Sequence, residues 1–278
     1  MSNITVDTAA GLNSALKAAQ DGDVILLKPG VYDGMSANYL SFANGITVTS
    51  YDPANPATLT HFDMISDNGI TFQNVQLATQ QVGYFDFQVF NSNNIHFDHV
   101  SIHGSLDGNP LNDIEGLGFS GCTNISVTNS EFQQLLRGLA ISMSNNVTVS
   151  GNTMHDLEIT GMAVGGGTNN ITISNNAIWN LFPQAGEHPD AIQFLTSGST
   201  VTSTGITVQL TDGSSRVVLV PASASITKSV NGASADLVAG KYVTVTGTAN
   251  SDGSVTASEI QLRNAPPSPR PSASPTAP

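Results

Sequence analysis

A short strand motif led by Asn recurs six times, and this repeat constrains the fold more than any other feature. The copies are NGITVTS, NGITFQN, NIHFDHV, NISVTNS, NVTVSGN and NITISNN. Their first apolar residues are Ile46, Ile70, Ile95, Ile125, Val147 and Ile171, spaced by 24, 25, 30, 22 and 24 residues. One such turn of chain cannot bury its apolar face alone, but turns stacked at about 4.8 Å can. The repeat therefore predicts an all-β parallel β-helix over residues 1–197.

Two features support a stacked coil. Leu12, Ala15, Leu16 and Ala19 share one helical face behind Asp7 or Thr8 as N-cap, so we expect a helix that caps the open end of the coil and protects its edge. The recurring Asn residues fall in one column, where their amides can hydrogen-bond to one another. That column comprises Asn94, Asn124, Asn146 and Asn170.

A second apolar strand precedes each Asn motif, and its alignment predicts which polar residues are neighbours. Matching the inward apolar pairs gives a column of Phe85, Glu115, Arg137, Thr160 and Asp190. The turns containing residues 105–116 and 181–190 are 30 residues long, whereas the two between them have 22 and 23. We expect the two insertions to form walls and the short turns, rich in Gly and Ala, to form a floor. Such a groove would be about 10–15 Å wide and would suit a polysaccharide chain.

Charge and composition exclude several functions. The formal net charge is -13, and the first 197 residues carry 17 Asp and Glu against Lys17, Lys28 and Arg137. No basic stripe could hold nucleic acid, and an acidic polysaccharide would be repelled unless a cation or Arg137 neutralised it. Cys122 is the only cysteine, which excludes an internal disulfide and a thiolate cluster. We expect no membrane span, see no classical signal peptide, and leave the oligomeric state open.

The GDVILLKPGVY opening and the Asn-led units resemble the right-handed parallel β-helix proteins of the pectate-lyase-like superfamily, over about residues 3–197. The resemblance implies an extracellular or cell-surface bacterial protein that acts on or binds polysaccharide. The superfamily includes lyases, glycosidases, uronan epimerases and non-enzymatic surface proteins. IHFDHVSI, with Asp98 and His99, resembles the strand that carries a calcium-binding Asp in pectate lyases. His188-Pro189-Asp190 is the reverse of the Asp-Pro-His motif of mannuronan C5-epimerases.

The segment GEHPDAIQF supplies the candidate catalytic groups. Uronate chains are cleaved or epimerised by removal of the C5 proton, which needs a base, an acid and a group that neutralises the carboxylate. His188 could be the base or acid, Asp190 could orient it, and Arg137 could neutralise the carboxylate. We expect Glu115, Thr160, Gln193 and Glu187 to bind substrate. Asp107 and Asp113 offer the oxygen ligands that Ca²⁺ prefers.

The pattern of the chain changes after the last Asn motif. Alternating strands separated by TDGSS and NSDG predict a small β-barrel over residues 198–264, which resembles a family of envelope-associated bacterial β-domains of unknown function. Residues 265–278 are rich in Pro and Ser and predict a disordered tail.

Two functional hypotheses follow. The first is a lyase or C5-epimerase that acts on a uronate-containing glycan through His188, Asp190 and Arg137. The second is a non-catalytic carbohydrate-binding or surface-structural β-helix, which the acidic surface and the presence of only one Arg in residues 1–197 favour.

Overall fold

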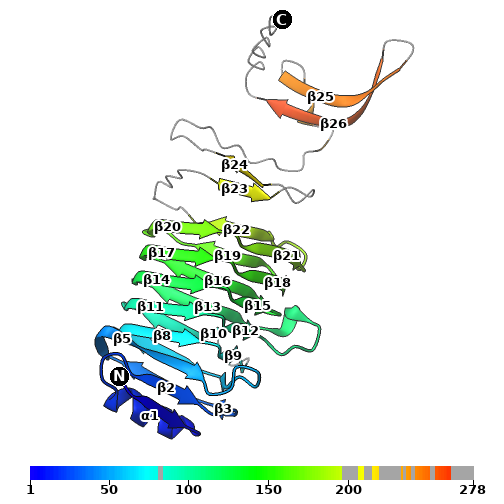
Figure 1. Ribbon diagram of the computed structural model, residues 1–278. Helices are drawn as coiled ribbons and strands as arrows, with labels where there is room; N and C mark the ends of the chain where they lie inside the picture. Colours follow the sequence, from blue (N-terminus) through cyan, green and yellow to red (C-terminus); the bar gives the residue numbers. More distant parts are fainter. Residues whose placement is uncertain are drawn as a thin grey trace, which may run out of the picture. The chain divides into compact units, whose positions relative to one another are not determined.

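The computed structural model describes residues 1–80, 84–195, 206–209, 215–218, 233, 236–238, 242–250 and 254–263. The chain divides into two compact units, Met1–Ala222 and Ser223–Pro278. The first unit contains a stack of parallel strands wound into a β-helix (Figure 1). The predicted right-handed parallel β-helix is therefore confirmed.

Three parallel sheets form the sides of the stack. Sheet A consists of β1 (Asn3–Val6), β2 (Val24–Leu27), β5 (Ser41–Ser50), β8 (Asn68–Gln73), β11 (Asn93–Asp98), β14 (Thr123–Thr128), β17 (Asn145–Ser150) and β20 (Asn169–Ser174). Sheet B consists of β3 (Val31–Tyr32), β6 (Thr58–Leu59), β9 (Gln76–Ala78), β12 (Ser101–His103), β15 (Glu131–Gln133), β18 (Thr153–Leu157) and β21 (Ala177–Leu181). Sheet C consists of β4 (Met35–Asn38), β7 (Phe62–Ile65), β10 (Phe85–Phe90), β13 (Glu115–Ser120), β16 (Arg137–Ser142), β19 (Thr160–Val164) and β22 (Asp190–Phe194).

A helix closes the N-terminal end of the stack, as predicted. Helix α1 (Ala9–Ala18) buries Leu12, Ala15 and Leu16. Thr8 is its N-cap, and the Thr8 hydroxyl accepts a hydrogen bond from the Gly11 amide at 3.1 Å. The helix therefore shields the apolar end of the first turn from water.

The Asn column is confirmed as a hydrogen-bonded ladder on the outside of sheet A. Side-chain amides link Asn94 to Asn68, Asn124 to Asn94, Asn146 to Asn124 and Asn170 to Asn146 at 2.9 to 3.3 Å. The last four of these Asn residues have φ between 50° and 55°, a left-handed conformation that Asn tolerates better than most residues. In the two preceding turns this position is Gly45 or Gly69. A Cβ on Gly69 would lie 2.1 Å from the Phe42 carbonyl oxygen, so only Gly fits there.

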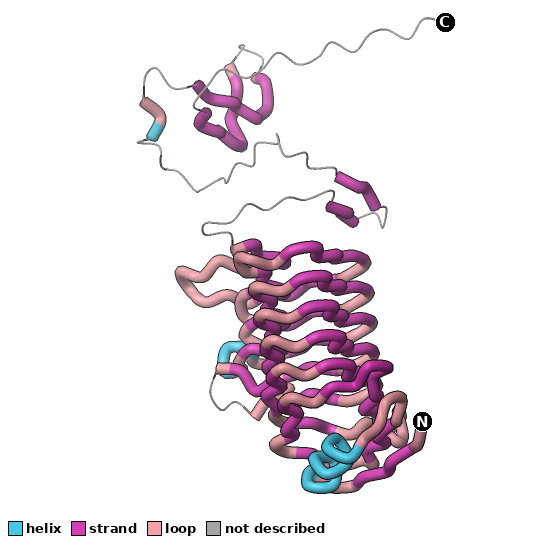
Figure 2. Tube along the Cα trace, turned by 90° about the vertical axis from the view of Figure 1, so that its left-hand side faces the viewer, coloured by secondary structure: helices cyan, strands magenta, loops and turns pink. Residues whose placement is uncertain are grey.

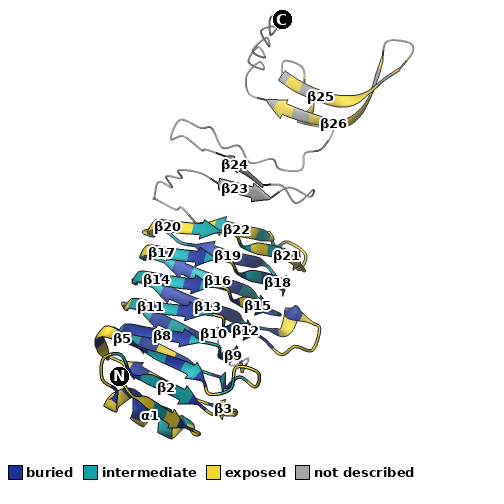
Figure 3. Ribbon diagram, in the orientation of Figure 1, coloured by how far each residue is buried: buried dark blue, intermediate teal, exposed yellow. Residues whose placement is uncertain are grey.

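The core is one continuous cluster of buried apolar side chains that all three sheets contribute. Figure 3 marks the buried residues along the strands of the stack in dark blue. Phe72 and Phe97 stack with ring centroids 4.9 Å apart, and Phe62 lies against both. The spacing of Phe72 and Phe97 follows directly from the pairing of β8 with β11 in sheet A. In the last turn, the inward residues Ile192 and Phe194 are 36% and 43% exposed.

Beyond the β-helix, the structure describes two short antiparallel pairs. Strand β23 (Ile206–Gln209) pairs with β24 (Ser215–Val218) in the first unit, and β25 (Tyr242–Ala249) pairs with β26 (Val255–Arg263) in the second. Much of the predicted barrel over residues 198–264, and all of the predicted tail over 265–278, lie outside the described residues, and the domain boundaries stay predictions. No helix in the described part of the chain is long and apolar enough to cross a membrane.

Candidate functional site

The predicted column of polar residues is confirmed by the strand register of sheet C. Phe85 pairs with Glu115, Arg137 with Thr160, and Thr160 with Asp190. Pairing of β13 with β16 from Leu117 onward places Glu115 beside Arg137. The column runs along the corner where sheet B leads into sheet C, and we call it the lip of sheet C.

A glycine ladder explains how the chain turns at this lip. Gly116, Gly138 and Gly161 each follow a lip residue. A Cβ on these glycines would lie 2.3, 2.7 and 2.6 Å from a carbonyl oxygen of the neighbouring turn. The bare backbone therefore allows successive turns to pack closely at the bend, which holds the lip side chains in register.

Glu115 and Arg137 form a buried ion pair. Arg137 Nη1 donates to Glu115 Oε1 at 2.6 Å, and the side chains are 20% and 1% exposed, respectively. Burial raises the pKa of Glu115, while Arg137 and a hydrogen bond from Tyr84 oppose that rise. Within the described part of the chain, Glu115 Oε2, Arg137 Nε and Thr160 Oγ1 are buried and have no hydrogen-bond partner. Three neighbouring turns thus present unsatisfied polar atoms at one place.

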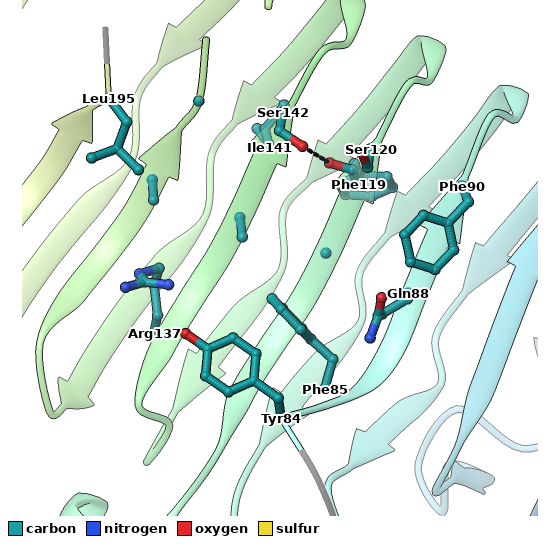
Figure 4. A pocket seen from close by; sticks show the side chains of 14 residues that line it. Tyr84, Phe85, Gln88, Phe90, Phe119, Ser120, Arg137, Ile141, Ser142 and Leu195 are labelled. Carbon is teal, nitrogen blue, oxygen red and sulfur yellow. Dashed lines mark hydrogen bonds between the residues drawn. The ribbon is translucent and has the colours of Figure 1, made fainter. Parts of the chain in front are cut away.

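A shallow depression lies next to this pair on the outer face of sheet C (Figure 4). Its floor contains Gly118, Ala140 and Ala163, and Arg137 and Tyr84 lie at its edge. The Phe85 ring lies 3.1 Å from the position of a Cβ on Gly118. Further lining residues include Gln88, Phe90, Ser142 and Leu195. The depression therefore combines a floor of small apolar residues with aromatic rings and one guanidinium group at the edge.

The first predicted wall is an extra loop between β12 and β13, which includes the 3₁₀ helix η1 (Pro110–Asn112). Asp107 accepts hydrogen bonds from the Asn109 amide and the Asn112 side chain, and the contact with Asn112, followed by that with Asn109, lowers the Asp107 pKa. Asp113 is buried and accepts from the Ser105 amide at 2.7 Å. Both predicted calcium ligands therefore stabilise the loop itself, and the calcium site stays a prediction.

The second predicted wall is the loop between β21 and β22. Glu187 accepts a hydrogen bond from the Gln184 amide at 2.6 Å, and the Gln184 side chain donates to Glu158. Burial raises the pKa of Glu158, and the nearby Glu187 raises it further. His188 is exposed and, among the described residues, has no hydrogen-bonding partner. Asp190 is half-buried at the end of the lip.

The two loops protrude from the same side of the stack, as expected (Figure 2). However, neither loop contributes a residue to the lining of the depression. The prediction that these loops form the walls of the binding groove is therefore wrong for this depression. Of the predicted site residues, Arg137 alone lines it; Gln193 pairs with Ala163 at the end of the floor column. Tyr84, which sequence reasoning missed, stands directly before the lip residue Phe85, and that position was its only signal.

The lip and the floor carry further acidic groups toward the N-terminal end. Asp86 is buried, accepts from the Gln80 amide at 2.6 Å and lies 3.6 Å from the His61 ring. Asp63 occupies the floor column one turn earlier, opposite Gln88. The surroundings of the depression are thus acidic apart from Arg137 and His61.

Asp98 and His99 lie on sheet A, on a different face. Asp98 accepts hydrogen bonds from Thr128, Asn129, Gln73 and His99. Burial alone would raise the Asp98 pKa, but these hydrogen bonds outweigh it and lower the value to about 2. Its oxygens are occupied in joining successive turns, which is a structural role.

His155 forms a second polar group, on sheet B. Its ring stacks on Trp179 with centroids 4.7 Å apart, and its nitrogens lie 2.7 Å from Asp156 and 3.1 Å from Glu131. Burial would lower the His155 pKa, but the two carboxylates raise it above its ordinary value. Trp179 is 43% exposed.

The structure offers little for a metal ion. Within the described residues, no group of three or more His, Cys, Asp or Glu side chains is placed to hold one. All six His residues and Cys122 belong to the described part of the chain. Cys122 is buried, and its thiol donates to the Val89 carbonyl oxygen at 3.2 Å. Burial raises the pKa of this thiol.

The comparison with a solved alginate lyase agrees with this architecture. Alginate lyase from Paenibacillus sp. str. FPU-7 has a TM-score of 0.57 and 17% identity, covering 69% of this chain and 74% of that chain. Pectate lyase Pel9A has a TM-score of 0.32 and 13% identity, covering 73% and 82%. No curated protein matches the chain. Residues 43–220 match the family NosD, described as periplasmic copper-binding protein. Because this match spans more than half of the sequence, the chain belongs to the NosD family.

Proposed function

We propose that the protein binds a polysaccharide chain on the outer face of sheet C. The observation that carries this proposal is the depression in which Phe85 and Tyr84 stand beside a floor of Gly118, Ala140 and Ala163. Aromatic rings present flat apolar faces on which the C–H faces of sugar rings can stack. Small floor residues allow a flat chain to approach the sheet. Gln88, Ser142 and Arg137 supply the few polar groups that orient a ligand in such a site.

Two comparisons support this proposal. The β-helix fold is shared with an alginate lyase, an enzyme named for a polysaccharide substrate. The name of the NosD family refers to the periplasm. We therefore place the proposed binding activity outside the cytoplasm, in the periplasm or at the cell surface.

The family name also refers to copper, but the residues of this chain do not fit a copper site. Copper in proteins is held by clusters of imidazole, thiolate or thioether ligands. The thiol of Cys122 is buried and donates to the Val89 and Ser120 carbonyl oxygens, and His96 lies on sheet A whereas His103 and His155 lie on sheet B. The described residues form no His, Cys, Asp or Glu cluster for a metal. No role of the protein is therefore derived from copper.

The binding proposal is tested with immobilised polysaccharides and a substitution in the depression. Phe85→Ala removes the aromatic surface over Gly118, and we expect it to weaken binding of the retained polymer by about tenfold, the loss of about 1.4 kcal/mol. Tyr51→Ala serves as the matched control, because Tyr51 is 59% exposed and follows β5 of sheet A. Equal binding by the Phe85→Ala variant and the wild type would contradict the proposal.

A second candidate is cleavage or C5 epimerisation of a uronate chain, with or without Ca²⁺. It is favoured by Arg137, which lines the depression and has an unpartnered buried Nε. In that reaction His188 would transfer the C5 proton and Asp190 would orient His188. The test is ultraviolet absorbance of unsaturated products, together with proton NMR at C5, for the wild type and His188→Ala. A signal that the wild type gives and the His188→Ala variant loses supports this candidate. If the wild type gives no signal by either method, this candidate is contradicted.

A further inference from the structure

We infer that the depression on sheet C selects a neutral glycan over a uronate chain; this inference rests on the proposed polysaccharide-binding function. It starts from the Glu115–Arg137 pair. Arg137 Nη1 is 2.6 Å from Glu115 Oε1, and the Glu115 side chain is 1% exposed. Withdrawing the guanidinium to serve a ligand would leave a buried carboxylate without its counter-charge. Arg137 is therefore already neutralised and is a poor counter-ion for a uronate carboxylate.

The remaining charges around the depression are also unfavourable for an acidic chain. Asp190 lies at the C-terminal end of the lip, and Asp63 lies in the floor column on the N-terminal side. Among residues 1–80 and 84–195, the only Lys and Arg besides Arg137 are Lys17 in α1 and Lys28 after β2, near the N-terminal end. A uronate polymer carries a carboxylate on every uronate sugar, so the repulsion between these carboxylates and the acidic side chains accumulates along the bound polymer.

The polar side chains that line the depression also suit hydroxyl groups. The Gln88 amide and the Ser142 hydroxyl can each donate and accept hydrogen bonds. A sugar hydroxyl group also donates and accepts, whereas a carboxylate only accepts. Neutral sugars, which carry hydroxyl groups on most carbons, fit this arrangement.

The test uses pairs of polymers that differ only in the carboxyl group. Alginate is compared with the carboxyl-reduced product of the same batch, and polygalacturonate with its reduced product. We expect a reduced polymer to bind at least about tenfold more tightly than its acidic parent. The difference should shrink at high salt, where the repulsion is screened. Equal or tighter binding of the acidic parents would overturn this inference and leave the binding function standing. No binding of any polymer would overturn both.

A substitution in the Glu115–Arg137 pair distinguishes an effect of its charge from an effect of side-chain shape. Glu115→Gln preserves the side-chain shape and leaves the Arg137 charge uncompensated, so the preference should move toward the uronate polymer by about tenfold. Asp190→Asn is the second variant if Glu115→Gln fails to fold, as judged by circular dichroism. It should move the ratio in the same direction by about two- to threefold. Asp7→Asn, an exposed acidic residue before α1, is the control and should leave the ratio unchanged. An unchanged ratio in both lip variants would overturn the inference.

Discussion

Removing the Arg137 charge should destabilise the β-helix in a way that depends on pH. Arg137→Met keeps much of the side-chain length but leaves the buried carboxylate of Glu115 without the contact at 2.6 Å. Breaking one partner of a buried ion pair costs about 3–5 kcal/mol of unfolding free energy. For a folded unit of this size, such a loss lowers Tm by roughly 6–20 °C.

The sign of the pH dependence follows from Glu115. Its pKa is raised by burial in the folded protein, so the folded state favours the protonated carboxyl, and stability falls as pH rises from the ordinary value through the raised one. Arg137→Met removes the group that opposes this rise. The loss of unfolding free energy in the variant, relative to the wild type, should therefore be largest at about pH 8. It should shrink toward about pH 4, where Glu115 is neutral.

Urea unfolding followed by circular dichroism at several pH values measures this effect. The double variant Glu115→Gln/Arg137→Met should recover most of the loss, because no buried charge remains. Lys17→Met, which removes an exposed charge from α1, should change the unfolding free energy by less than about 0.5 kcal/mol. A loss below about 1 kcal/mol for Arg137→Met near neutral pH, or an equal loss at all pH values, would refute the reasoning.

Three further predictions concern other parts of the molecule. Asn124→Ala removes side-chain hydrogen bonds of the outer ladder and places Ala at φ 55°, so we expect urea unfolding to show a loss of about 2–3 kcal/mol of unfolding free energy. Asn124→Gly should restore part of this loss, because Gly tolerates a positive φ. Equal losses in the two variants would contradict the backbone contribution. Trp179 is the single Trp and stacks on His155, whose pKa is raised. Trp fluorescence emission should therefore increase as the pH rises through a midpoint above 6.5. The stability that the charged form of His155 contributes should be lost over the same pH range. His155→Gln should abolish this transition, and a midpoint below 6.5 would argue against the carboxylate contacts. After gel filtration in the presence of a chelator, the protein should retain less than one equivalent of copper by elemental analysis, whereas one retained equivalent would show a site that the described residues do not reveal.

The repeat made the register of sheet C predictable. Once the inward pairs were aligned, the period of two in each strand determined that Glu115, Arg137 and Thr160 would be neighbours. The Asn ladder was predictable for the same reason.

Loop conformation was not predictable in this way, because it depends on local hydrogen bonds rather than on a period. Asp107, Asp113 and Glu187 accept hydrogen bonds within their own loops, and no pattern in the sequence distinguishes such an acceptor from a ligand. Tyr84, at the edge of the depression, lies just before β10, outside the strand positions that the repeat predicts.

The most direct test of the central claim is isothermal titration with an oligosaccharide of the polymer that the protein retains, comparing the wild type with Ala140→Trp. Ala140 lies in the floor of the depression, so an indole there would occupy the space proposed for the sugar chain. Thr172→Trp on exposed strand β20 of sheet A is the matched control. The account predicts that Ala140→Trp raises Kd by at least about tenfold while Thr172→Trp leaves it unchanged. Unchanged binding by Ala140→Trp would show that the glycan does not bind on sheet C.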